Sequence, residues 1–119
     1  MRPFKQIYDM QIENQSLLVN NNLYDNVEKM SLPTDNVALA SYHVQQLISE
    51  IGEVLAADKR WKNIRNDKYD RDNKREEIAD CFIVLMNIAI FSGMSAEELE
   101  NEIINKLQVV NKRFKEKIS

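Results

Sequence analysis

The segment from Ile78 to Phe91 constrains the fold more than any other part of the chain. Twelve of its fourteen residues are apolar or Cys, and only Asp80 and Asn87 interrupt it. It is too short to cross a bilayer, which takes roughly 20 residues. A helix that is apolar on nearly every side is buried on nearly every side. Three other short helices could hardly cover it, so we expect it to lie in the core of a homo-oligomer, either a dimer or a tetramer.

The rest of the sequence is also typical of helices. A chain of 119 residues is the size of one domain, and two Gly and two Pro are too few for a turn-rich β fold. Apolar periodicity predicts helices over residues 4–19, 34–59, 73–92 and 96–117, with a loop or short helical piece before Pro33. We therefore predict one domain, residues 1–119, with an all-α fold: a four- to five-helix bundle assembled through oligomerisation.

Capping residues set the expected helix ends. Thr34 or Asp35 can cap the second helix, and Asn73 with Glu76 resembles a capping box for the third. Gly93 is placed to end the third helix, and a second capping box, Ser95 with Glu98, opens the fourth.

One stripe of the second helix is apolar at three- and four-residue steps, which predicts that it is buried. Its members are Val44, Leu47, Ile48, Ile51 and Leu55. The predicted fourth helix has a similar stripe, formed by Leu99, Ile103, Leu107, Val110 and Phe114.

Charge and cysteine content exclude some classes of protein. The net charge is −3 and the pI is about 5.2, which argues against binding to a nucleic-acid polymer. The single Cys81 cannot form an internal disulfide and fits a reducing compartment. The N-terminal residues contain no apolar core of a signal peptide. We therefore expect a soluble cytoplasmic protein without a membrane partner.

Two acidic pairs are the candidate functional residues. Glu77, Asp80 and Asn87 fall on one side of the apolar helix, and a carboxylate in a dry bundle needs an ionic partner or a metal. Glu50 and Glu53 share a face of the second helix, away from its apolar stripe, and Gly52 allows close approach. Two facing helices could thus offer four carboxylates to a hard cation such as Mg²⁺.

Simpler interpretations of these acids stay open. Glu50 and Glu53 could form a solvated face, and Glu77 could interact with the helix dipole. A ferritin-like di-iron site needs Glu-x-x-His motifs, but His43 has no Glu three residues before it. We expect His43 at the surface or at an interface.

The two acidic motifs in order carry a family resemblance. Glu50-Ile-Gly-Glu53 followed after 23 residues by Glu77-Ile-Ala-Asp80 resembles the ExxE…ExxD signature of the all-α nucleoside triphosphate pyrophosphohydrolases, the MazG-like group. The apolar helix from Asp80 to Asn87 and beyond, the turn at Gly93 and the basic elements Asn105-Lys106 and Asn111 to Phe114 extend the resemblance over about residues 36–115. Met10-Gln11 and residues 59–62 also look similar to elements of the dimeric all-α dUTPases.

The resemblance implies hydrolysis between the α and β phosphates, giving a nucleoside monophosphate and pyrophosphate. It implies Mg²⁺, with Mn²⁺ as an alternative, held by Glu50, Glu53, Glu77 and Asp80, and a water activated by Glu50 or Glu53. Candidate substrate-binding residues are Lys59, Trp61, Lys62, Asn87, Lys106 and Arg113.

These binding residues also have structural interpretations. Lys106 and Arg113 lie seven apart on one side of a helix and could grip phosphate or form a solvated basic face. Trp61 could stack on a base or pack at a helix end, and Asn87 could be a satisfied buried amide.

Three functions follow from this sequence. The first is a Mg²⁺-dependent pyrophosphohydrolase that acts on a nucleoside triphosphate, expected to be a dNTP, in house-cleaning of the nucleotide pool. The second is a dUTP- or dCTP-specific diphosphatase of the dimeric all-α type. The third is a non-catalytic helical protein that binds a partner and whose acids keep it soluble.

Overall fold

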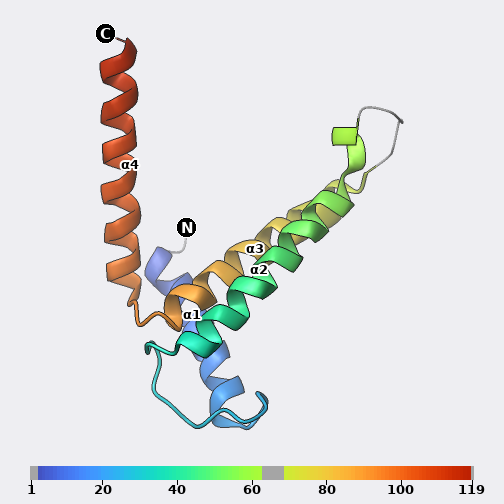
Figure 1. The fold of residues 1–119 in the computed structure, drawn as a ribbon, viewed down its shortest axis with the longest axis vertical. Helices are drawn as coiled ribbons and strands as arrows, with labels where there is room; N and C mark the ends of the chain where they lie inside the picture. The colour runs from blue at the N-terminus through green and yellow to red at the C-terminus, as the bar shows by residue number, and fades with distance from the viewer. Residues whose placement is uncertain (1–2, 63–68, 119) are drawn as a thin grey trace.

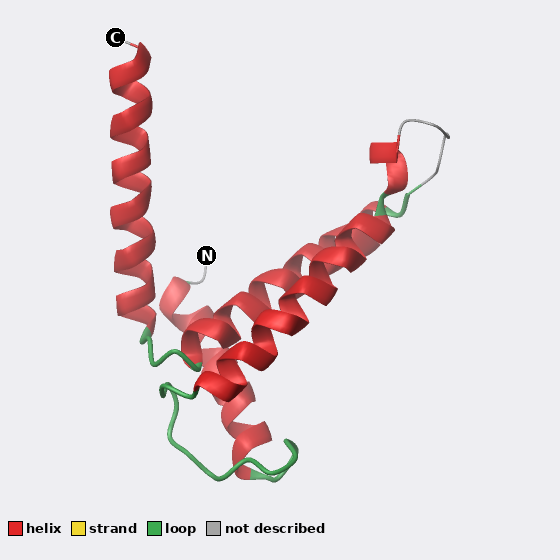
Figure 2. Ribbon diagram, in the orientation of Figure 1, coloured by secondary structure: helices red, strands yellow, loops and turns green. Residues whose placement is uncertain are grey.

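The computed structural model describes residues 3–62 and 69–118, and within these ranges the chain is all-α (Figures 1 and 2). Its α-helices are α1 (Phe4–Asn20), α2 (Val37–Ala57), α3 (Arg71–Ile90) and α4 (Ala96–Ile118). A short 3₁₀ helix, η1 (Lys59–Lys62), follows α2. The predicted fold class is confirmed, and the described residues include no strand longer than an isolated bridge.

The helices form two arms that meet at a junction (Figure 1). Helices α2 and α3 pair as an antiparallel hairpin, which is one arm, and α4 is the other. Helix α1 packs against both α3 and α4 where the arms meet. The arms diverge as a V, and the radius of gyration is 17.7 Å. A compact domain of this length would have roughly 13–14 Å, so the single chain is not a closed bundle.

The buried core lies at the junction. Tyr8, Ile90 and Ala96 join α1, α3 and the start of α4, while Val19 and Phe91 join the end of α1 to the end of α3. The Tyr8 hydroxyl donates a hydrogen bond to the Met94 carbonyl oxygen at 2.7 Å, and burial raises the Tyr8 pKa to about 12. The junction therefore combines apolar packing with a satisfied buried hydroxyl.

The start of α2 lies later than predicted because its expected caps have another role. Thr34 N–H donates to the Ile90 carbonyl at 3.0 Å, and Asp35 forms a bridge with Ser92. Asn36 takes over as the cap, with its side-chain oxygen accepting from Leu39 N–H at 3.1 Å. The loop before α2 is thus attached to the end of α3.

The ends of α3 and α4 test the other capping predictions. Asp70 caps α3 by accepting from the N–H groups of Asp72 and Asn73, so the capping box predicted at Asn73 is wrong. Gly93, at φ +80°, ends the turn after α3 as predicted. The Ser95–Glu98 capping box is confirmed, with reciprocal bonds of 3.1 and 3.2 Å.

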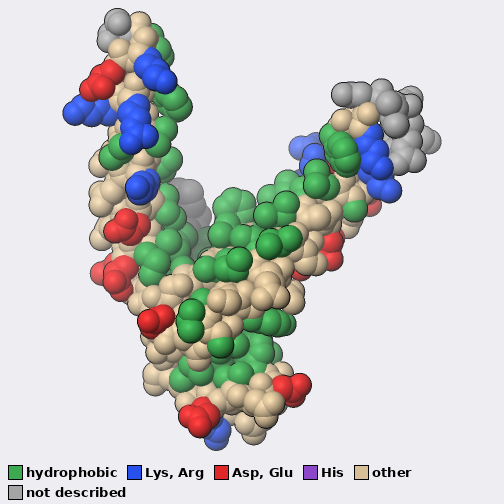
Figure 3. Space-filling model, viewed as in Figure 1, with side chains coloured by type: hydrophobic (Ala, Val, Ile, Leu, Met, Phe, Trp, Pro, Cys, Tyr) green, Lys and Arg blue, Asp and Glu red, His purple; other side chains and the backbone are tan. Residues whose placement is uncertain are grey.

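The apolar stripes are largely uncovered in the single chain. On α2 the prediction of a buried stripe is wrong, because Ile48 is 67% exposed and only Leu47 is half-buried. On α3, which we expected to be covered on nearly every side, Phe82 is 64% exposed. Figure 3 shows hydrophobic side chains along both arms of the V. Among the described helices, none combines the length and hydropathy needed to cross a membrane.

Candidate metal centre

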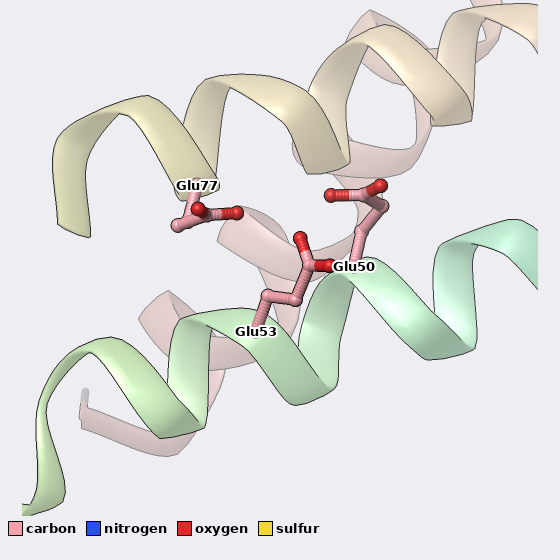
Figure 4. A group of neighbouring side chains, drawn as sticks. All are labelled: Glu50, Glu53 and Glu77. Carbon is pink, nitrogen blue, oxygen red and sulfur yellow. The ribbon is translucent and has the colours of Figure 1, made fainter. Parts of the chain in front are cut away.

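Three glutamates meet between α2 and α3. Glu50 and Glu53 project from α2 and Glu77 from α3, and one carboxylate oxygen of each lies within 4.8 Å of the others (Figure 4). Glu50 and Glu77 are half-buried at the helix–helix contact, and Glu53 is exposed at its edge. We call these three residues the acid cluster. The structure thus brings together three of the four predicted metal ligands.

Two oxygens of the acid cluster are buried without a partner. Glu50 Oε2 and Glu77 Oε2 are shielded from solvent, and no hydrogen bond reaches them. A buried acceptor without a donor is destabilising, and more so when it is charged. A bound cation would remove this cost, and an all-oxygen set of carboxylates suits a hard divalent ion. The residues present therefore fit Mg²⁺ or Mn²⁺.

Burial and the crowding of like charges raise the pKa of two members of the acid cluster, Glu50 and Glu77. Burial, followed by the neighbouring Glu53 and Asp80, raises the pKa of Glu50. The pKa of Glu77 is raised first by its contact with Glu53 and then by burial and by the charges of Asp80 and Glu50. Without a counter-ion these carboxylates repel each other, and a divalent cation would reverse that effect.

Asp80 differs from its prediction. It is exposed in the single chain and lies outside the 4.8 Å group, although its charge is close enough to raise the pKa of Glu50 and Glu77. The argument that Asp80 needs a partner because it is buried is therefore wrong here. Its apolar neighbours on α3, such as Phe82, are themselves uncovered.

A salt-bridged clamp closes the hairpin next to the acid cluster. The Asp58 side chain is buried and accepts from Arg60 through two bonds of 2.8 and 2.7 Å and from Lys74 at 2.9 Å. Arg60 also lies 3.5 Å from the ring centre of Tyr69. Hydrogen bonds from Arg60 and then Lys74 hold the Asp58 pKa well below its usual range. Because Lys74 is one turn before Glu77, the clamp fixes how α3 meets α2.

The predicted binding residues of η1 lie beyond this clamp. Lys59 and Trp61 are exposed, and Lys62 is half-buried with its Nζ 5.5 Å from the Trp61 ring centre. Trp61 Nε1 donates to the Leu55 carbonyl oxygen at 3.2 Å. This contact attaches Trp61 to the end of α2 and corresponds to its structural interpretation.

Asn87 forms a buried amide pair with α1. Its Oδ1 accepts from Gln11 Nε2 at 2.7 Å, and Gln11 Oε1 accepts in turn from Asn14 at 3.2 Å. Both Gln11 and Asn87 are buried. Asn87 therefore helps to hold α1 against α3.

Lys106 and Arg113 do not meet the acid cluster within one chain. Both are exposed on α4, in the arm that diverges from the hairpin (Figure 1). Their predicted approach to a triphosphate would need another arrangement of α4 or another copy of the chain.

Two features were not predicted from the sequence, one next to the acid cluster and one at the junction. Asp58 and Arg60 were not among the candidate site residues, although an acid directly after a helix with a cation two residues later is a visible signal. His43, expected at a surface or interface, is 4% exposed and stacks on Phe91 with ring centres 5.4 Å apart. Its Nε2 lies 3.2 Å from the Tyr24 hydroxyl.

A separate cavity lies at the other end of α2. It has a volume of about 920 Å³, and Tyr24, Asn36 and Tyr42 are among its lining residues. It shares no residue with the acid cluster, so the two are independent features.

Comparison with protein-family models, curated proteins and solved structures gives no match to this chain.

Proposed function

We propose that this chain is a metal-dependent pyrophosphohydrolase that converts a nucleoside triphosphate, with dNTPs as the expected substrates, to the monophosphate and pyrophosphate. The observation that carries the proposal is the pair of buried, partnerless oxygens on Glu50 and Glu77 beside Glu53. The two acidic motifs occur in the same order as in the MazG-like enzymes, and this resemblance is the basis for the proposed type of reaction. Mg²⁺ is the proposed ion and Mn²⁺ the alternative, in a role in nucleotide-pool house-cleaning.

Each acid has a distinct position for this reaction. Glu50 and Glu77 would offer covered oxygens to the cation, and Asp80, whose charge acts on Glu50, is the proposed fourth ligand. When bound, the cation supplies charge neutralisation at the phosphate oxygens. Glu53 is the exposed member of the acid cluster, so it is the better placed glutamate to accept a proton from an attacking water.

The proposed reaction also needs cationic side chains that bind the phosphates of the substrate. Arg60 and Lys74 are already paired with Asp58, so we assign them to holding the hairpin. Phosphate binding then falls to Lys59 and Lys62 beside the hairpin, and to Lys106 and Arg113 if assembly brings α4 to it. A homo-oligomer in the cytoplasm is the proposed working form.

A panel of canonical and modified dNTPs tests this function through detection of pyrophosphate, with and without Mg²⁺. We expect metal-dependent turnover that falls about 100-fold or more in Glu53→Gln and in Asp80→Asn. Glu13→Gln, an exposed acid on α1, is the matched control and should keep wild-type turnover. Wild-type turnover in both site variants would exclude this assignment.

A specificity for dUTP or dCTP is the second candidate. The observation that favours it is the buried Gln11–Asn87 pair, because Gln11 belongs to the element that looks similar to the dimeric all-α dUTPases. In the same panel, turnover confined to pyrimidine deoxynucleotides would support this candidate, and broad turnover would exclude it.

The exposed arms favour a third candidate, a non-catalytic partner-binding protein. A thermal melt with millimolar Mg²⁺ and a non-hydrolysable dNTP separates it from an enzyme. A ligand that binds only the folded state raises the melting temperature. An unchanged melting temperature, with no turnover in the panel, would support the third candidate.

A further inference from the structure

The cavity at the start of α2 has a wall made by the segment between α1 and α2, residues 21–36. This segment contains no helix, and Figure 1 shows it at the end of the hairpin opposite to η1. Both of its ends are bonded to helices, because Leu23 N–H donates to the Leu18 carbonyl oxygen at 3.0 Å and Thr34 N–H donates to that of Ile90 at 3.0 Å. Loops this long usually either have a function or are disordered. The cavity volume of about 920 Å³ is in the range of small-molecule sites, which favours a binding function.

Two tyrosine rings that line this cavity are held by buried side chains. The rings of Tyr24 and Tyr42 have centres 6.3 Å apart and are nearly perpendicular, at 84°. The Tyr24 hydroxyl donates to Gln15 Oε1 at 2.5 Å, so its oxygen is free to accept from His43 Nε2 at 3.2 Å. Gln15 and His43 are both buried, and the His43 ring also contacts the Tyr42 ring, with centres 5.0 Å apart. Because both rings are held in place, a ligand would not have to order them.

The cavity also carries an excess of negative charge. Asp25, Glu28 and Asp35 line it, and within the described part of the chain Lys29 is the one cationic side chain that does so. Among the residues that the structure describes, no ion pair engages any of these four side chains. Carboxylates without a counter-ion repel phosphates and other anions and attract cations. The charge of the cavity therefore favours a cationic ligand.

The spacing of these acids favours an organic cation over a metal ion. A divalent metal ion needs several oxygen ligands that converge on one point. Within residues 3–62 and 69–118, the acid cluster is the only group in which three His, Cys, Asp or Glu side chains bring ligand atoms within 4.8 Å of one another. An organic ammonium ion needs no such convergence, and the faces of aromatic rings attract it. Its carbon skeleton would lie against Met30 and Leu39, which also line the cavity.

We propose that this cavity binds an organic ammonium ion, with the charge beside the two tyrosine rings and the three acids and the carbon skeleton in the apolar part. The cavity shares no residue with the acid cluster and takes no part in the proposed hydrolysis. The two proposals can therefore succeed or fail separately.

Titration of the full chain with choline, followed by the amide ¹H and ¹⁵N chemical shifts, is the first test. The matched control ligand is 3,3-dimethylbutanol, which has the shape of choline but a neutral carbon in place of the ammonium nitrogen. We expect choline to shift the resonances of residues 23–42, with a dissociation constant about 5-fold or more below that of the alcohol. An equal response to both ligands, or no response to choline, would overturn the proposal.

Substitutions separate the contribution of the rings from that of the acids. Tyr42→Leu keeps an apolar side chain without the ring and should weaken choline binding about 5-fold, whereas Tyr42→Phe keeps the ring and should bind like the wild type. Glu28→Gln should weaken binding about 3-fold at low ionic strength and less at high salt, since salt screens exposed charges. Glu13→Gln, at an exposed acid on α1 outside the cavity, should bind like the wild type. Equal losses in the two Tyr42 variants, or in the two glutamate variants, would contradict the proposal.

The acid cluster provides the last control. Glu77→Gln alters the candidate metal centre and should leave choline binding unchanged. Mg²⁺ at constant ionic strength should not displace choline, because the acids of the cavity do not converge as metal ligands do. Loss of choline binding in Glu77→Gln, or displacement of choline by Mg²⁺, would show that choline binds elsewhere and would overturn the assignment of the cavity.

Discussion

The junction and the arms of this molecule are built from the same kinds of residue but differ in what surrounds them. At the junction, Phe91 is fully buried between α1, α2 and the end of α3, and it stacks on His43. On the hairpin arm, Phe82 lies nine residues earlier on the same helix and is 64% exposed. Apolar character therefore does not decide burial here; the presence of a neighbouring helix does.

The residues that stabilise the single chain and the residues of the candidate site lie in different parts of the molecule. The residues that hold the single chain together lie at the junction, whereas the acid cluster lies on the hairpin, between helices that contact mainly each other. The Asp58 clamp beyond the acid cluster then limits how far the hairpin can open.

The largest expected effect is at the junction. Phe91→Ala should destabilise the protein by about 3–5 kcal/mol, because it leaves a cavity beside His43. Denaturant unfolding measures the loss. Phe82→Ala is the matched variant on the arm, and in a single chain its cost should be below about 1 kcal/mol. A large, concentration-dependent cost at Phe82 would show that a partner covers the arm.

Metal addition should act on the hairpin. Mg²⁺ at 100 times its dissociation constant should stabilise the wild-type protein by about 2.7 kcal/mol, measured by thermal unfolding. Glu77→Gln should lose this response. Because the folded-state pKa of Glu77 is raised, its ionised form destabilises the metal-free fold at pH 7, and stability is gained as pH falls through the raised pKa. Glu77→Gln should therefore be more stable than the wild type in chelator; lower stability there would contradict this account.

The capping box at the start of α4 should have a smaller effect. Ser95→Ala removes the acceptor of the Glu98 N–H and should cost about 1 kcal/mol. Because α4 has few neighbours, we expect this loss as faster hydrogen exchange within α4, with the junction unchanged. Asn101→Ala, inside the same helix, is the control. Equal changes at the junction would mean that α4 and the junction unfold as one unit.

The smallest expected effect is the acid sensitivity of the clamp. Because the Asp58 pKa is lowered in the folded state, its stabilisation is present above the ordinary value of 3.8 and is lost as pH falls toward the lowered pKa. Solvent screens the pair, since the Arg60 and Lys74 side chains are 53% and 33% exposed. Asp58→Asn should flatten the fall in stability below about pH 4. Asp9→Asn, in the exposed Lys5–Asp9 pair, should leave this pH dependence of the stability unchanged.

The sequence predicted the helices better than their surroundings. The all-α class, the Gly93 turn and the Ser95–Glu98 capping box follow from local chemistry, and each is confirmed. The start of α2 was misplaced because Thr34 and Asp35 bond to the distant end of α3, and such a long-range contact leaves no local pattern.

The candidate site was predicted in part for a similar reason. Spacing placed Glu50, Glu53 and Glu77 on facing helices, and the structure brings them together. Burial of Asp80 was inferred from the apolar residues around it in sequence, but periodicity defines a face and not what covers it. The role of Asp58 depends on Lys74, sixteen residues away, which spacing alone does not reveal.

The turn at Gly93 connects the two arms, so its backbone conformation affects the direction of helix α4. Its φ of +80° suits glycine, and a Cβ there would lie 3.4 Å from the Asp35 backbone nitrogen. Helix α4 has 23 residues, so it is about 34 Å long, and a 10° change in its direction would move its tip by about 6 Å. A substitution at Gly93 would therefore strain the turn from which the whole C-terminal arm extends.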